Sequence, residues 1–171
     1  MFLKHLTLSA TAVYLTGVLV GCYIDPPLEI MHPDAGTSLQ LLEQPKVKQF
    51  YLILANNISV ALINLMGGFS LGILSLLNTF YNGVVLGYAL SVSMDHFSVS
   101  EILGHFLPHG IEILAIIISC SLGLYLGSYF IKKLLLDKAS EFEYRMFFFQ
   151  TAFTMAIILA AAFLEVYVSF S

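Results

Sequence analysis

The chain has 171 residues, of which 58% are hydrophobic and 11% charged, and its mean hydropathy is +0.89. A soluble domain carries about 25% charged residues, so this composition excludes a water-soluble globular protein, and the apolar content excludes a disordered chain. The formal net charge of −4, with seven basic residues, excludes a nucleic-acid-binding surface.

The apolar residues form runs of the length that a membrane-spanning helix requires, about 20 residues. We therefore expect an all-α, polytopic transmembrane bundle with about five spanning helices in the lipid bilayer, forming a single domain over residues 1–171. The predicted segments are a first helix over residues 6–24, an outer loop over 25–49, a core over 50–131, a cytoplasmic loop over 132–145 and a last helix over 146–171.

The first helix ends in the sequence Leu19-Val20-Gly21-Cys22, which has two interpretations. A charged start, an apolar stretch and a Gly-Cys ending are typical of a bacterial lipoprotein signal, in which Cys22 would be lipidated. We prefer a retained helix, because the rest of the chain is already embedded in the membrane and needs no lipid anchor.

The core contains three apolar runs, Phe50–Leu77, a short one over Gly83–Met94 with its flanks, and Leu107–Ile131. The first of these is longer than one crossing requires. As an alternative, residues 69–94 form a broken or re-entrant pair of short helices that reverses at Asn82-Gly83, because Asn-Gly favours a turn.

Basic residues predict the orientation, since Lys and Arg near helix ends stay on the cytoplasmic side. With the N-terminus inside, the cytoplasmic side holds Lys4, Lys132, Lys133, Lys138 and Arg145, whereas the outer side holds Lys46 and Lys48. We therefore expect a multi-pass protein of the cell (inner) membrane with a cytoplasmic N-terminus and an external C-terminus.

Glycines four residues apart recur in four segments, and in lipid such small residues let helix backbones approach closely. The pairs are Gly17/Gly21, Gly68/Gly72, Gly83/Gly87 and Gly123/Gly127. We interpret them as packing sites inside one bundle, and a homo-oligomer interface is the alternative.

Polar residues inside apolar runs are the candidate functional residues, because such groups usually face the interior of the bundle or a water-filled cavity. Glu112 is the acid that we expect to be embedded in this way. Pro108 kinks the helix or begins a new one, and in both cases His109 and Glu112 share one face. On a continuous helix, His105 lies on that face as well.

Three interpretations of this polar cluster stay open. In a structural one, His109 and Glu112 bond to each other and to Asn56 and Asn57 in the same leaflet, which fixes the helix register. In a metal-binding one, His105, His109 and Glu112 hold zinc, although HxxxHxxE lacks the general base of zincin hydrolases. In a transport one, the His109/Glu112 cleft carries protons or a polar solute.

The order of the motifs resembles the stage II sporulation protein M family of integral membrane proteins. The resemblance covers Phe50 to Gly127 and rests on Asn56-Asn57, Gly68-xxx-Gly72, Asn82-Gly83-xxx-Gly87, Pro108-His109-Gly110-Ile111-Glu112 and Gly123-xxx-Gly127. It adds Asn82 to the candidate polar residues.

The resemblance implies a membrane scaffold or accessory subunit for cell-envelope partners, without a catalytic site or cofactor of its own. The sporulating member of the family works with a peptidoglycan hydrolase and an amidase during engulfment of the forespore. Relatives also occur in organisms that do not sporulate, so the family name does not fix the role of this chain. A small transporter or channel-like protein is the alternative, and an intramembrane metal-binding protein is the third possibility.

The predicted topology can be tested with a reporter that is active only in the cytoplasm. We expect it to be active when fused after Leu136 and inactive when fused after Ser171, because five spans place these positions on opposite sides of the membrane. A cytoplasmic C-terminus would require an even number of crossings and would contradict the five-helix topology.

Overall fold

The computed structural model describes residues 2–24, 44–94, 96–136 and 141–169. The regular structure of these residues is all helical, and five helices are long and apolar enough to cross a membrane. This confirms the predicted fold class. In chain order the helices are α1 (Phe2–Tyr23), α4 (Lys46–Met66), α5 (Ile73–Met94), α6 (Val99–Phe130) and α7 (Tyr144–Leu164).

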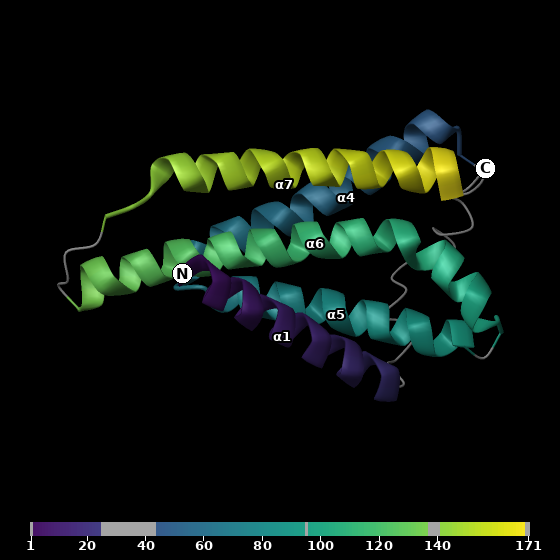
Figure 1. The fold of residues 1–171 in the computed structure, drawn as a ribbon, viewed down its shortest axis with the longest axis horizontal. Helices are drawn as coiled ribbons and strands as arrows, with labels where there is room; N and C mark the ends of the chain where they lie inside the picture. The colour runs from purple at the N-terminus through teal and green to yellow at the C-terminus, as the bar shows by residue number, and fades with distance from the viewer. Residues whose placement is uncertain (1, 25–43, 95, 137–140, 170–171) are drawn as a thin grey trace.

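Consecutive helices run in alternating directions along one bundle (Figure 1). One end, here called the turn end, carries the start of α1, the connection from α4 to α5 and the end of α6. The other end, here called the cavity end, carries the ends of α1, α5 and α7. Of the described basic residues, Lys4, Lys132, Lys133 and Arg145 belong to the turn end, and Lys46 and Lys48 to the cavity end. In the predicted orientation, the turn end is therefore the cytoplasmic one.

The connection between α4 and α5 is a short 3₁₀ turn, η1 (Gly67–Ser70), followed by two residues with positive φ. Leu71 has φ 58° and Gly72 has φ 92°. The amide of Gly72 donates to the carbonyl of Gly67 over 2.8 Å, which closes the end of the first helix, and the Ser70 hydroxyl accepts the amide of Leu74 over 2.9 Å. The chain therefore reverses within six residues that carry no charge.

The alternative reversal at Asn82-Gly83 is wrong, because both residues lie inside α5. The Asn82 side chain donates to the carbonyl of Asn78 one turn earlier, over 2.8 Å, so its amide is satisfied within the helix. Residues 73–77, which we assigned to the end of the preceding apolar run, are the first turn of α5. The chain reverses instead at Leu71 and Gly72, the two residues with positive φ.

The turn between α4 and α5 packs against two glycines of α6. A Cβ added to Gly127 would lie 2.7 Å from the amide nitrogen of Gly72, and one added to Gly123 would lie 3.1 Å from the carbonyl carbon of Asn64. Real Cβ atoms do not come as close as 2.7 Å to another backbone. Gly123 and Gly127 thus provide the space that the α4–α5 hairpin occupies.

Two further glycine pairs bring α1 and α5 together in parallel. A Cβ on Gly17 would lie 3.1 Å from the Cα of Gly83, and a Cβ on Gly83 would lie 3.1 Å from the Cα of Gly17. One turn further on, a Cβ on Gly87 would lie 3.0 Å from the amide nitrogen of Cys22, whose thiol contacts the Gly87 carbonyl at 3.4 Å. These contacts lie within one chain, as the interpretation of internal packing requires.

Helix α6 is longer than the predicted apolar run. It begins at Val99, passes through Pro108 and continues into a π-helical turn, η2 (Ile131–Leu135). Figure 1 shows it bending in its N-terminal third, the part that contains the proline, and an interior proline kinks a helix in this way. Helix α7 likewise continues into a π-helical turn, η3 (Glu165–Ser169). The candidate spans of these two helices are His109–Leu134 and Tyr144–Tyr167.

We expect Gly123→Leu and Gly83→Leu to lower the thermal stability of the protein in detergent. A side chain placed against a neighbouring backbone forces the helices apart, and overpacking of this kind costs about 1–3 kcal/mol. Gly110→Leu is the matched control, because an added Cβ there meets nothing within 4 Å. Equal melting of the Gly123→Leu variant and the parent would place that face of α6 against lipid.

Candidate functional site

The candidate site begins with two side chains one turn apart on α6. His109 and Glu112 share a helix face, and Nδ1 of His109 lies 3.0 Å from Oε2 of Glu112. The side chain of His109 is 39% exposed and that of Glu112 is 17% exposed. Glu112 is thus mostly enclosed by the bundle, while His109 lies closer to its surface.

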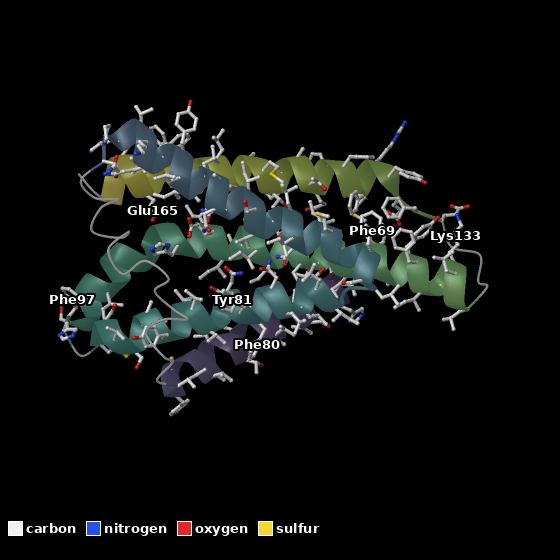
Figure 2. The ribbon with its side chains drawn as sticks, turned by 180° about the vertical axis from the view of Figure 1, so that it is seen from behind. Phe69, Phe80, Tyr81, Phe97, Lys133 and Glu165 are labelled. Carbon is white, nitrogen blue, oxygen red and sulfur yellow. The ribbon has the colours of Figure 1, made fainter. Side chains whose placement is uncertain are left out.

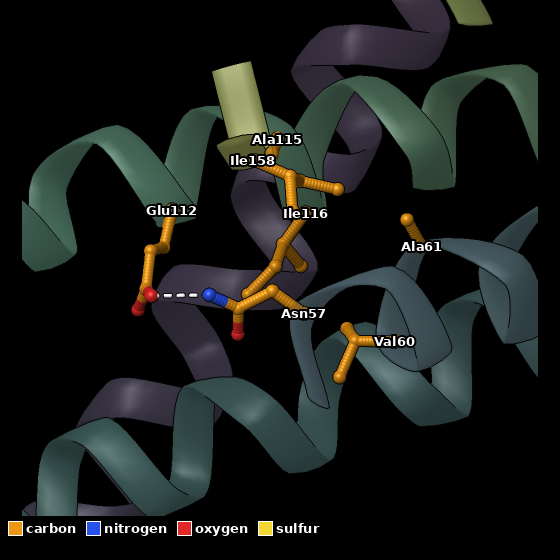
Figure 3. Close-up of a pocket in the computed structure, with 7 residues that line it drawn as sticks. All are labelled: Asn57, Val60, Ala61, Glu112, Ala115, Ile116 and Ile158. Atoms are coloured by element: carbon orange, nitrogen blue, oxygen red, sulfur yellow. Dashed lines mark hydrogen bonds between the residues drawn. The ribbon is translucent and has the colours of Figure 1, made fainter. Parts of the chain in front are cut away.

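The other carboxylate oxygen of Glu112 bonds to α4. Nδ2 of Asn57 donates to Oε1 of Glu112 (Figure 3), so both oxygens of Glu112 have a partner. Asn56 is exposed, and its amide donates to Oδ1 of Asn57 over 3.3 Å. The cluster therefore joins α4 to α6 near the cavity end.

A third helix contributes Glu165, the first residue of η3. Figure 2 shows it near the C-terminal end of α7, on the side that faces α6. One ligand atom each from His109, Glu112 and Glu165 lies within 4.8 Å of the other two, and all three residues are half-buried. Two carboxylates and one imidazole thus converge from two helices.

A cavity of about 270 Å³ reaches this cluster. A water molecule takes about 30 Å³ of liquid, so several waters fit beside the carboxylates. The residues that line the cavity come from α4, α6 and η3, and they are Leu52, Ile53, Asn56, Asn57, His109, Glu112 and Glu165.

A second, much smaller void of about 10 Å³ lies deeper in the bundle (Figure 3). Its lining is mainly apolar and consists of Asn57, Val60, Ala61, Glu112, Ala115, Ile116 and Ile158. A void of this size holds one water molecule at most. Asn57 and Glu112 line both spaces, so their hydrogen bond separates the cavity from the interior.

Still deeper, Asn64 is the centre of a separate polar cluster. Its side chain is fully buried, and Nδ2 donates to the hydroxyl of Ser119 over 2.9 Å and to the carbonyl of Ile116 over 3.2 Å. Oδ1 of Asn64 accepts Nδ2 of Asn78 over 2.8 Å, and its backbone carbonyl accepts the Ser75 hydroxyl over 2.6 Å. This amide joins α4, α5 and α6.

Asn82 belongs to this deeper cluster, because its amide bonds to Asn78. Asn82, which we named as an additional candidate, thus has its amide donor bonded within α5. Of the other predicted residues, Asn57, His109 and Glu112 come into contact, and Asn56 joins them through Asn57. The side chain of His105 lies outside the described part of the structure.

Glu165 is the site residue that sequence reasoning missed. Glu112 is the embedded acid predicted from the sequence, and Glu165 is not among the predicted candidate residues. Yet Glu165 follows 19 consecutive uncharged residues after Arg145, which is the same signal that singled out Glu112. Its position in the last apolar run was sufficient to identify it as an intramembrane acid.

Comparisons with known proteins give two matches. A family model described as Stage II sporulation protein M matches residues 10–170. The chain is also 32% identical over 126 residues to an uncharacterized protein of Methanocaldococcus jannaschii, and the match covers 70% of each chain. No solved structure matches this chain.

The site predicts different effects for two substitutions of Glu112. Glu112→Gln keeps an oxygen that accepts the Asn57 amide, so we expect stability close to that of the parent. Glu112→Ala removes the acceptor of the Asn57 amide inside the bundle, and an unsatisfied polar group away from water costs about 1–3 kcal/mol. Thermal unfolding in detergent measures both variants.

Glu141→Ala is the control for this pair, because Glu141 is an exposed acid. We expect it to melt with the parent. If Glu112→Gln destabilises the protein as much as Glu112→Ala, the negative charge of the carboxylate is what the bundle requires, and hydrogen bonding alone does not explain the cluster.

Proposed function

The chain belongs to the stage II sporulation protein M family, and we propose that it is a membrane-embedded scaffold or accessory subunit for cell-envelope proteins. In this proposal it lies in the cell membrane with the turn end in the cytoplasm and the cavity end outside. Its partners carry the catalytic activity, and this chain positions them.

The observation that supports a scaffold is that the helices pack closely beneath a cavity that does not continue through the bundle. The cavity ends at the Asn57–Glu112 hydrogen bond, beyond which lies a void for one water molecule at most. At Gly123 and Gly127 the helices then touch backbone to backbone. Transporters move one set of helices against another around their site, whereas close-packed interiors resist such deformation.

The partner-binding surface in this proposal is the cavity end. Tyr23 is 90% exposed there, and Met94 and Phe97 are also exposed. We expect partners to bind the predicted outer loop, which connects the end of α1 to the start of α4. Residues 25–43 of this loop lie outside the described residues.

A small transporter remains the second candidate, and the cavity itself favours it. A space of about 270 Å³ lined by an imidazole and two carboxylates has the chemistry to hold a cation or a proton-donating solute. This function requires a conformation in which the Asn57–Glu112 contact opens.

Site-specific photo-crosslinking in native membranes tests the scaffold proposal. We would place a benzoylphenylalanine at Phe97, on the cavity end, and at Tyr144, on the turn end, which are 55% and 64% exposed. We expect Phe97 to crosslink to an identified protein with an external domain, and Tyr144 not to crosslink to that protein. The same partner should lose its membrane localisation when the scaffold is deleted.

Two results would contradict the proposal. One is a pattern in which both positions crosslink only to lipid or to the chain itself. The other is uptake of a solute by the purified protein in vesicles, which is lost in Glu112→Ala. The second result would favour the transporter.

A further inference from the structure

We propose that His109, Glu112 and Glu165 bind one divalent transition-metal ion, with Zn²⁺ preferred, at the cavity end of the bundle. The proposal rests on donor atoms, charge and access at this site. It does not depend on the scaffold function, because a metal ion can fix the ends of α6 and α7 in a scaffold and in a transporter alike.

The first argument is the convergence of three donors from two helices. The nearest ligand atoms of these residues lie within 4.8 Å of one another. Zinc binds imidazole nitrogen and carboxylate oxygen at about 2.0–2.2 Å, so ligand atoms on one tetrahedral ion lie about 3–4 Å apart. A contraction of about 1 Å completes the site, and rotations of side chains beside an open cavity provide it without moving a helix.

The second argument is that two acidic side chains face a single basic one. The imidazole of His109 forms an ion pair with one of the two carboxylates, that of Glu112. Two carboxylates therefore share one imidazole inside two candidate membrane spans. A carboxylate at this depth is costly unless it is paired or protonated, and a divalent cation that displaces the proton pairs with both carboxylates.

The third argument is the orientation of Glu112 and the access to it. Asn57 donates to Oε1 of Glu112 and so holds the carboxylate with Oε2 toward His109, as outer hydrogen bonds to metal ligands do. The cavity of about 270 Å³ opens onto the same three residues, so water can occupy the remaining coordination position. An imidazole among the donors favours Zn²⁺ over Mg²⁺ and Ca²⁺, which prefer oxygen ligands alone.

Metal analysis of the full chain in detergent tests the proposal. The protein would be purified with a tag that contains no histidine, stripped with a chelator and dialysed against Zn²⁺. We expect one zinc per chain by elemental analysis, a raised melting temperature with Zn²⁺, and no comparable shift with Mg²⁺. Less than a tenth of a zinc per chain would overturn the proposal.

Variants then locate the ion. Glu165→Gln removes a ligand from α7 and should weaken zinc binding at least tenfold. Asn57→Ala removes the orienting hydrogen bond and should weaken it about 10–100-fold, the usual effect of losing such a partner. Glu141→Gln changes an exposed acid and should bind zinc as the parent does.

A variant that restores a ligand distinguishes the loss of a zinc ligand from misfolding. Glu165→His supplies an imidazole where Glu165→Gln supplies none, so it should recover zinc binding, and melting without metal shows whether each variant is folded. Zinc binding by folded Glu165→Gln at the affinity of the parent would overturn the proposal. The crosslinking at Phe97 tests the scaffold proposal independently of zinc. A protein that binds no zinc would therefore overturn the metal site alone.

Discussion

The close approach of α6 to α4 at Gly123 is the constraint on which the polar groups of the bundle depend. Because Gly123 has no side chain, the backbone of Asn64 lies against it, and the Asn64 amide then reaches Ser119. The contact between Asn57 and Glu112 spans the same 55 residues of sequence and lies seven residues earlier on each helix. Since α4 and α6 run in the same direction (Figure 1), the two contacts are one pairing repeated after two turns, as in a heptad register.

The two contacts lie in different surroundings. Asn64 is in the closed interior, whereas Glu112 borders the cavity. Asn64 is fully buried, and both its amide donor and its carbonyl acceptor are bonded, so its bonds fix the register of three helices and leave no group for a ligand. Glu112 is 17% exposed and borders a cavity that also reaches His109 and Glu165. The deeper amide stabilises the fold, and the carboxylate of Glu112 stays accessible through the cavity.

The sequence predicted the helices from their apolar runs and the contacts of Gly83, Gly87 and Gly123 from their four-residue spacing. It also predicted that His109 and Glu112 share a face, because helical periodicity alone determines that. It misplaced the reversal of the core. Asn-Gly favours a turn, but here the packing of α5 on α1 keeps both residues inside a helix. The apolar run before Glu165 marks it as an embedded acid, but periodicity does not encode its proximity to His109 and Glu112, which lie more than 50 residues away in the chain.

The shared register also restricts how the bundle can move. A shift of α4 along α6 by one residue is about 1.5 Å and a rotation of about 100°, and it would break the Asn57–Glu112 and Asn64–Ser119 contacts together. It would also drive side chains of α4 into the backbone at Gly123, where no Cβ fits. The cavity end therefore cannot rearrange by sliding α4 without loss of packing at the turn end. Such coupling favours a bundle that holds a partner or an ion in one fixed geometry over one that alternates between two.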